Sequence, residues 1–348
     1  MGVNKVIFDL SKEEINNFFH SIGEPDYRTS QLWEGLYCHL YPSWNNFTIF
    51  SKRLRGIITE NFSFSTIRPL THSFSTDKKT HKVLFELPDK NRIETVLMQY
   101  KKSNTLCISS QSGCAIGCVF CATGKMGFNR NLTSGEIIEQ VIFFARELQK
   151  KGKQLTNIVI MGMGEPFYNY NATMNAISRL NNPDGFNFGS RRFTLSTIGI
   201  IPKLEEFIHE NKQINLAISL HAPNNDLRNK LVPINKKYPI EELIATCKKY
   251  VKISHRRISF EYVLINEVND SKKYAIELSS LIKDLLCHVN LIPLNPNPHF
   301  KGKPPELKVI QDFKKILESH GITTTIRRNM GIDIQAGCGQ LAGSHKKL

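Results

Sequence analysis

The feature that most constrains the fold is a regular alternation of short β-rich runs and helical runs that begins near residue 104. The β-rich runs are expected to be strands at residues 105–110, 157–161, 192–197, 215–220, 258–264, 288–293 and 323–327. The runs with helical spacing between them cover residues 134–149, 170–180, 202–209, 240–251, 271–285 and 306–319. A repeated strand–helix unit predicts a parallel sheet with right-handed crossover connections.

The number of repeats narrows the architecture further. About six units fit into this part of the chain, which is fewer than the eight that close a barrel. We therefore predict an α/β fold in which residues 104–348 form a partial barrel of six strand–helix units, written (βα)6. A doubly wound sheet stays open as the alternative, because hydrophobic periodicity does not separate the two.

The chain before residue 104 has a different pattern. Ser11 is followed three residues later by Glu14, which is the capping-box signal for the start of a helix. We expect residues 1–75 to form a small helical accessory domain. Residues 76–103 are expected to form a connecting β-hairpin, because two alternating runs flank a turn-forming stretch at 88–91.

Composition excludes several classes of protein. The hydrophobic fraction of 41% is enough for a buried core, so the chain is not disordered. No stretch approaches the roughly 18 uncharged apolar residues of a membrane span. The N-terminus is not a signal peptide, so we expect a cytoplasmic protein without membrane association. The net charge of +15 is typical of a protein that binds a polyanion, although a merely basic surface would give the same sum.

The chain has eight cysteines, and four of them lie between residues 107 and 121. In a chain without a secretory signal, clustered thiols more often bind metal or carry out redox chemistry than form disulfides. Cys38, Cys247 and Cys287 lie in apolar surroundings instead. We expect those three to be buried structural thiols.

Cys114, Cys118 and Cys121 form a C-x3-C-x2-C motif just after the first strand of the alternation. Three thiolates can hold an iron–sulfur cluster and leave one iron open, because a cubane cluster usually takes four. Zinc is the competing interpretation, with Cys107 as the fourth ligand of a closed site. Zinc sites usually present ligands as two C-x2-C pairs, and the sequence has no second pair, which favours the cluster.

Residues suited to ligand binding follow several of the expected strands. They are Gly164, Glu165, Ser196, Ser219, Leu220, His221 and Asn295. The carboxyl ends of the strands in a βα fold form the rim at which ligands bind. Glycine lets a ligand approach the backbone, and the polar side chains suit an ammonium, a ribose or a carboxylate. Each residue alone also fits a turn or a cap, so the prediction rests on their joint placement on one rim.

Taken together, these motifs resemble the RlmN/Cfr family of radical S-adenosylmethionine (SAM) RNA adenine methyltransferases, and most closely the RlmN branch. The matching segments lie in the same order and spacing at residues 107–111, 114–124, 161–166, 195–199, 219–221, 290–295 and 338–341. The N-terminal segment around residues 24–28 is also similar.

The resemblance implies two cofactors and a set of ligands. Cys114, Cys118 and Cys121 would hold a 4Fe–4S cluster, whose open iron is chelated by the methionine part of SAM. One electron then cleaves SAM to a 5′-deoxyadenosyl radical. The SAM-binding residues implied are the rim residues Gly164, Glu165, Ser196, Ser219, Leu220, His221 and Asn295.

The resemblance also implies covalent chemistry at a second pair of cysteines. Cys338 would take a methyl group from one SAM and become an S-methylcysteine intermediate, while a second SAM supplies the radical. Cys107 would later attack the sulfur of Cys338 and leave a transient disulfide. Glu94 matches the proton acceptor of the family by its position relative to Cys107.

The implied partners are 23S rRNA and tRNA, contacted in part by residues 1–75, and an electron donor such as flavodoxin or ferredoxin. The chain is expected to be a monomer that methylates C2 of adenine. The segment 331–334 departs from the RlmN pattern and is nearer to Cfr, so methylation of C8 of the same rRNA adenine, which gives antibiotic resistance, is the alternative. A non-enzymatic, zinc-containing RNA-binding protein is the alternative from another class.

Overall fold

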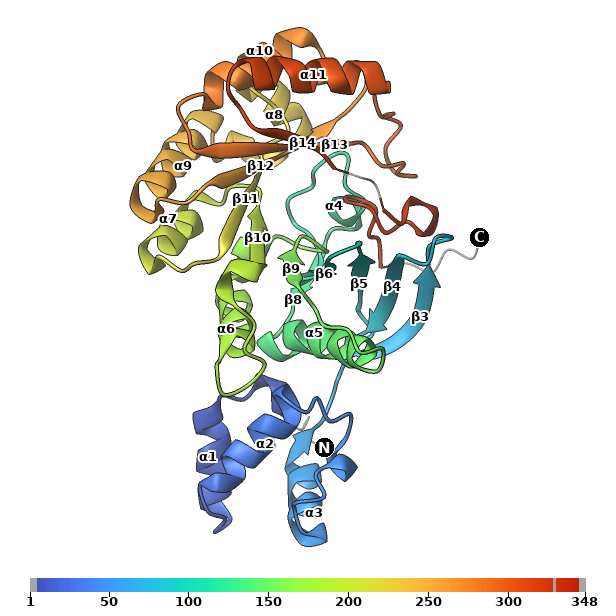
Figure 1. Ribbon diagram of the computed structural model, residues 1–348, viewed down its shortest axis with the longest axis vertical. Helices are drawn as coiled ribbons and strands as arrows, with labels where there is room; N and C mark the ends of the chain where they lie inside the picture. Colours follow the sequence, from blue (N-terminus) through green and yellow to red (C-terminus); the bar gives the residue numbers. More distant parts are fainter. Residues whose placement is uncertain (1–4, 328–329, 344–348) are drawn as a thin grey trace.

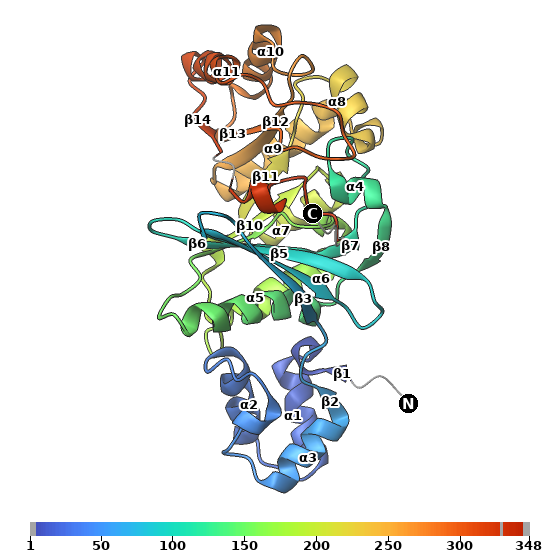
Figure 2. The same ribbon diagram turned by 90° about the vertical axis from the view of Figure 1, so that its right-hand side faces the viewer.

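The structure is a computed structural model that describes residues 5–327 and 330–343. Figure 1 shows a helical N-terminal lobe, a long sheet flanked by helices, and a C-terminal segment that returns from one end of the sheet toward the other. The view in Figure 2 shows that the N-terminal lobe lies beyond helices α5 (Ser134–Gln149) and α6 (Tyr170–Asn181), away from the sheet.

One mixed sheet contains ten strands in the order β14-β13-β12-β11-β10-β9-β6-β5-β4-β3. Strands β6 and β9 to β14 are parallel, and β3 to β5 continue the sheet in antiparallel pairing. The strands are β3 (Arg68–Phe74), β4 (Thr80–Glu86), β5 (Arg92–Gln99), β6 (Asn104–Ile108), β9 (Asn157–Ile160), β10 (Phe193–Thr197), β11 (Asn215–Ser219), β12 (Ile258–Leu264), β13 (Cys287–Pro293) and β14 (Thr324–Ile326).

A helix connects each parallel strand to the next. After α5 and α6 these connecting helices are α7 (Ile201–Glu210), α9 (Ile240–Ser254), α10 (Lys272–Ile282) and α11 (Leu307–Ser319). The six strand–helix units end in β14, which confirms the predicted α/β fold with a partial barrel. No helix among residues 5–327 and 330–343 is both long and apolar enough to cross a bilayer.

The N-terminal lobe contains α1 (Lys12–Ser21), α2 (Tyr27–Tyr37), α3 (Lys52–Asn61) and the short parallel strands β1 (Lys5–Val6) and β2 (Phe62–Ser63). The predicted capping box is present, since the Ser11 side chain accepts from the Glu14 N–H and the Glu14 carboxylate accepts from the Ser11 N–H. Buried aromatic side chains, among them Phe19, Trp33 and Phe47, fill the interior of the lobe.

Two arginines attach the lobe to the barrel. Arg146 on α5 donates to the carbonyl oxygen of Leu40 at 2.9 Å, and Arg179 on α6 donates to the carbonyl oxygen of Asp9 at 2.8 Å. The side chain of Asp9 in turn accepts from the N–H of Gly135 at the start of α5. The lobe is therefore fixed to the two helices by bonds to its backbone and to the side chain of Asp9.

Some elements differ from those predicted. Strands β4 and β5 form the expected hairpin, but β3, which lies within the range assigned to the helical domain, extends it to three antiparallel strands. The sequence pattern also did not predict the short elements around the cysteine motif and after β11. They are β7 (Gln111–Gly113), α4 (Ala122–Met126), β8 (Phe128–Asn131) and α8 (Asn225–Leu231). Short 3-10 turns complete the described chain at η1 (Ile7–Asp9), η2 (Trp44–Asn46), η3 (Pro166–Asn169), η4 (Ser190–Arg192), η5 (Pro233–Lys236) and η6 (Ile332–Ile334).

Candidate active site

A cavity lies at the carboxyl ends of the parallel strands, where ligand sites of βα folds are found. Its lining includes most of the residues predicted from the sequence, namely Cys114, Cys118, Cys121, Gly164, Glu165, Ser196, Ser219, His221, Asn295 and Cys338. Among the predicted SAM-binding residues Leu220 is the exception, because its side chain is fully buried in the core and does not line the cavity. Residues that are far apart in the sequence therefore meet at one place.

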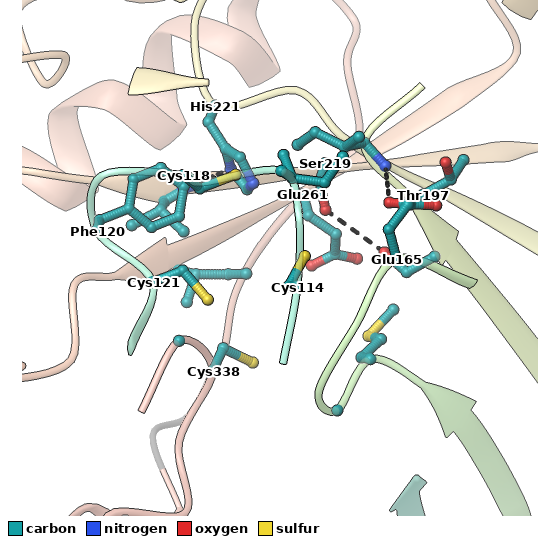
Figure 3. A pocket seen from close by; sticks show the side chains of 18 of the residues that line it. Cys114, Cys118, Phe120, Cys121, Glu165, Thr197, Ser219, His221, Glu261 and Cys338 are labelled. Atoms are coloured by element: carbon teal, nitrogen blue, oxygen red, sulfur yellow. Dashed lines mark hydrogen bonds between the residues drawn. The ribbon is translucent and has the colours of Figure 1, made fainter. Parts of the chain in front are cut away.

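The three cysteines of the motif surround a common space, with Cys338 beside it (Figure 3). The loop that carries them turns sharply at Gly113, whose φ is +77° and where a Cβ would lie 2.0 Å from the Gly127 carbonyl oxygen. Burial raises the pKa of the Cys114 thiol to about 12 and raises that of Cys118 well above its usual value. A bound metal would offset this, since it stabilises the thiolate form.

The arrangement bears on the choice between cluster and zinc. Within the described part of the chain, no three His, Cys, Asp or Glu side chains are arranged closely enough to hold a single metal ion. Cys107, the fourth zinc ligand considered from the sequence, does not line this cavity. Thiols spread around a cavity suit a cluster that is wider than a single ion, so the donor set fits an iron–sulfur cluster better than zinc.

The segment after β9 is held close to the cysteine loop. Gly164 has a φ of +103°, and a Cβ there would lie 2.6 Å from the Cβ of Gln111. The next residue, Glu165, donates its N–H to the Gln111 side chain, and its carboxylate accepts from the N–H groups of Phe167 and Ile198 at 3.0 and 2.9 Å. Burial raises the pKa of Glu165 to about 7. Backbone donors therefore fix this carboxylate at the cavity wall.

His221 occupies the rim after β11 in a left-handed conformation with φ +62°. Its Nδ1 accepts from the N–H of Val263 at 3.1 Å, which requires an unprotonated Nδ1. Burial lowers the pKa of His221 to about 3, so the ring is neutral. The ring meets the edge of Phe120 with 5.0 Å between centroids. His221 is thus a fixed, neutral part of the wall.

A second cavity adjoins the first and is lined by Cys107. Cys338, Asn295 and Arg327 line both cavities, so they lie at the boundary between them. Burial raises the pKa of the Cys107 thiol to about 12. The structure thus brings Cys107 and Cys338 to one cavity although they are far apart in the sequence.

The loop that carries Cys338 is tied to two other parts of the protein. The side chain of Asn295 donates to the carbonyl oxygen of Cys338 at 3.0 Å. The carbonyl oxygen of Gly339 accepts from the N–H of Ala122 in the cysteine loop, and that of Leu341 accepts from the hydroxyl of Thr123. These bonds hold Cys338 against the loop of Cys114, Cys118 and Cys121.

Glu94 lies outside both cavities. Its carboxylate forms an ion pair with Lys82, with 2.7 Å between Nζ and Oε1. The other oxygen accepts from the N–H groups of Ala342 and Gly343 at 2.8 and 3.2 Å. Glu94 therefore contacts the C-terminal loop, and not the space between Cys107 and Cys338.

Sequence reasoning missed Glu261 and Arg327, which also line the first cavity. A charged residue within the apolar run 258–264 is the signal that could have revealed Glu261.

The expectation that Cys38, Cys247 and Cys287 are buried structural thiols holds in part. Cys247 and Cys287 are buried, but Cys38 is exposed, with its thiol 3.2 Å from the Gly185 carbonyl oxygen, so the prediction of a buried thiol was wrong there.

Comparisons with known proteins agree with the fold and the site. The Radical SAM superfamily matches residues 108–278, and the ribosomal RNA large subunit methyltransferase N-terminal domain matches residues 5–63. A probable dual-specificity RNA methyltransferase RlmN of Dictyoglomus thermophilum is 46% identical over 344 residues, 99% of this chain and 98% of that protein. One of Caldanaerobacter subterraneus is 44% identical over 97% of this chain and 98% of its own length.

A solved structure shows the same similarity in three dimensions. The crystal structure of a radical SAM methyltransferase from Sphaerobacter thermophilus has a TM-score of 0.96 and 46% identity, and covers 98% of this chain and 100% of that chain. The match includes both the lobe and the barrel, because so little of either chain is left out. The chain therefore belongs to the RlmN family of radical SAM RNA methyltransferases.

Proposed function

We propose that this enzyme methylates C2 of adenine in RNA, at adenine 2503 of 23S rRNA and adenine 37 of tRNA. The name of its relatives, dual-specificity RNA methyltransferase, supports two kinds of RNA substrate. The observation that carries the proposal is the position of Cys338, which lines both the cavity with the three thiols and the cavity with Cys107. A group carried on the sulfur of Cys338 would have access to both.

The chemistry of the target explains why a cysteine is needed. C2 of adenine has no lone pair with which to attack the methyl group of a sulfonium ion. SAM therefore cannot transfer its methyl group directly to C2. In the proposed reaction the thiolate of Cys338 attacks the methyl group of SAM and becomes S-methylcysteine. When bound by Cys114, Cys118 and Cys121, a 4Fe–4S cluster with a second SAM supplies a radical that removes a hydrogen atom from this S-methyl group.

The remaining steps use residues of the second cavity and the loop. The S-methylene radical on Cys338 adds to adenine, the adduct gives up one electron to the oxidised electron carrier, and Glu94 takes up the ring proton. The thiolate of Cys107 then attacks the sulfur of Cys338, and the released carbon takes up a proton to become the methyl group. The RNA then leaves with its methyl group, and the Cys107–Cys338 disulfide is reduced before the next turnover. For Glu94 this role requires movement of the loop, because its carboxylate bonds the N–H groups of Ala342 and Gly343.

The rim residues would bind SAM. Gly164 and Glu165 would hold its methionine amino group, while Ser196, Ser219, His221 and Asn295 would contact the remaining parts. The hydroxyl oxygens of Ser196 and Ser219 are 3.5 Å apart, so both could serve one ligand group. Leu220 would contribute only through its backbone, since its side chain is buried.

The RNA substrate determines which parts of the protein it contacts and where in the cell the reaction takes place. RNA would contact the N-terminal lobe as well as the barrel, since the net charge of +15 favours binding to phosphates. The target base must leave its stack to reach a buried cavity. We propose that the enzyme is a monomer in the cytoplasm, where its RNA substrates are found. Flavodoxin or ferredoxin would be the electron donor.

One experiment tests the proposal and its alternatives. The anaerobically reconstituted protein is incubated with SAM, a reductant and either an rRNA fragment or tRNA, and the nucleosides are analysed by mass spectrometry. We expect 2-methyladenosine together with 5′-deoxyadenosine. Production of 8-methyladenosine would support the alternative carbon. RNA binding without either product would support the non-enzymatic RNA-binding protein.

A further inference from the structure

We propose that Glu261 on β12 is a SAM-binding residue that accepts hydrogen bonds from the ribose hydroxyls of the adenosyl group. This inference rests on the proposed use of SAM in the first cavity and adds a residue to the set predicted from the sequence. It is carried by one buried carboxylate oxygen that has no hydrogen-bond donor within residues 5–327 and 330–343.

Glu261 is placed by the register of the sheet. It pairs with Ser219 on β11 and with Asn290 on β13, and Asn290 pairs with Thr325 on β14. Residues in register on neighbouring parallel strands point to the same face, so these four side chains form a polar row across the sheet. The row begins at Ser219 and Glu261 in the first cavity (Figure 3).

One oxygen of the carboxylate is fixed by this row. The side chain of Asn290 donates to Oε1 of Glu261 at 2.8 Å. The Oδ1 of Asn290 in turn accepts from the hydroxyl of Thr325, which leaves its amide nitrogen turned toward Glu261. Glu261 is therefore held in one orientation before any ligand binds, which reduces the entropy that binding costs.

The other oxygen has no hydrogen-bond partner among the described residues, although it is buried. Arg327 Nη1 lies 3.9 Å away, beyond hydrogen-bond distance. Burial raises the pKa of Glu261, while Arg327 and Asn290 act against that rise. A buried acceptor without a donor is costly, so this oxygen marks a place where a ligand supplies the donor.

The chemistry of SAM matches this requirement. Its adenosyl part carries two neighbouring ribose hydroxyls, and acidic side chains bind ribose hydroxyls in the same way in dinucleotide-binding folds. Glu165, the other acidic residue of the cavity wall, already accepts from two backbone N–H groups. Ser219, the neighbour of Glu261 in register, adds a hydroxyl that can bond the same ribose.

The test measures binding rather than turnover. The anaerobically reconstituted protein is studied by equilibrium dialysis with SAM and with a SAM analogue that lacks both ribose hydroxyls. Glu261→Gln keeps the shape of the side chain and removes its charge. We expect this variant to bind SAM about tenfold more weakly or worse, because hydrogen bonds to charged groups are the stronger ones. The analogue should bind the wild type and Glu261→Gln equally.

Two controls accompany the variant. Glu242→Gln makes the same chemical change at an exposed position of α9 and should leave both affinities unchanged. Iron content and visible absorbance show whether Glu261→Gln folds and keeps its cluster. If it does not, Asn290→Ala replaces it, because loss of the orienting amide should weaken SAM binding more than analogue binding.

The outcomes separate this inference from the proposed function. An unchanged affinity of Glu261→Gln for SAM, or an equal loss for SAM and the analogue, would overturn the assignment of Glu261 alone. The second result would mean that the carboxylate serves the sulfonium charge or the fold, and not the ribose. A wild-type protein with its cluster that binds no SAM would overturn the proposed function and this assignment together.

Discussion

Lys82 and Glu94 form an ion pair between the neighbouring strands β4 and β5, and both side chains are largely buried. Lys82 also donates to the carbonyl oxygen of Gln335, and Glu94 accepts from the N–H of Ala342. These two backbone contacts lie on either side of Cys338 in the sequence. One ion pair therefore holds both arms of the loop that carries Cys338.

We predict that Glu94→Gln destabilises the protein by about 3 kcal/mol, because it leaves the charge of Lys82 without its counter-ion. Urea unfolding under anaerobic conditions measures this. The double variant Lys82→Met/Glu94→Gln should recover part of the loss. Iodoacetamide should also alkylate Cys338 faster in Glu94→Gln, since the loop is less firmly held.

The same variant tests the role that the resemblance implies for Glu94. A residue that acts only as the proton acceptor would leave both the free energy of unfolding and the alkylation rate unchanged in Glu94→Gln. It would instead leave RNA attached to Cys338, because the ring proton could not be removed. Mass spectrometry of the protein after incubation with RNA separates the two results.

Much of the fold could be predicted because its signals are local. The capping box of Ser11 and Glu14 and the strand–helix alternation each depend on residues close together in the sequence. The C-x3-C-x2-C motif is equally local. By contrast, β3 is an edge strand that contains Pro69 and is mostly exposed, so it lacks the alternating pattern of a half-buried strand.

The parts of the site that escaped prediction depend on contacts between distant residues. Glu261 could be recognised as a site residue only from the strand register, which places it between Ser219 and Asn290. Glu94 contacts Ala342, which is 248 residues away in the sequence. No local pattern encodes such contacts, whereas the resemblance supplied a role for Glu94 without its surroundings.

We predict that Cys107→Ala keeps its iron and its visible absorbance after anaerobic reconstitution. Cys107 shares the second cavity with Cys121 but does not line the first cavity, which Cys114, Cys118 and Cys121 surround. Cys118→Ala is the matched control and should lose both signals. With RNA and SAM present, Cys107→Ala should accumulate RNA covalently bound to Cys338. Loss of iron from Cys107→Ala would identify Cys107 as a ligand instead.

A buried histidine predicts a stability loss in mild acid. His81 stacks on Phe74 with 4.1 Å between ring centroids, and its burial lowers its pKa from 6.5 to about 4. The unfolded chain therefore takes up this proton first as the pH falls. As the pH falls from 6.5 to about 4, the contribution of His81 to the free energy of unfolding falls by up to about 1.4 kcal/mol per pH unit. This contribution is fully present only above pH 6.5.

His81→Phe should remove this component, because it keeps the aromatic packing without the titrating nitrogen. The measurement compares the free energy of unfolding, obtained with urea at about pH 7 and at about pH 5, between the wild type and the variant. His209→Gln, at an exposed position of α7, should keep the pH dependence of the wild type. A pH dependence that is the same in His81→Phe and the wild type would show that other groups cause it.

The last prediction concerns the residue before Cys338. A Cβ on Gly337 would lie 2.6 Å from Nδ2 of Asn295 and 2.8 Å from Oε1 of Gln340. Those two atoms make the bonds that fix the loop, since Asn295 donates to the Cys338 carbonyl oxygen and Gln340 accepts from the Gly337 N–H. We therefore expect Gly337→Ala to displace Cys338 without changing any reactive group.

Gly337→Ala should keep its iron, its visible absorbance and its affinity for RNA, but methylate RNA at least about tenfold more slowly, since misplacement of reacting groups by about 1 Å is costly. Mass spectrometry of the protein should show less S-methylation of Cys338. Gly189→Ala is the matched control, because a Cβ there meets nothing within 4 Å. Wild-type methylation of both Cys338 and RNA by Gly337→Ala would show that the anchored position of the loop is not needed for the reaction, and that Cys338 acts from a mobile segment.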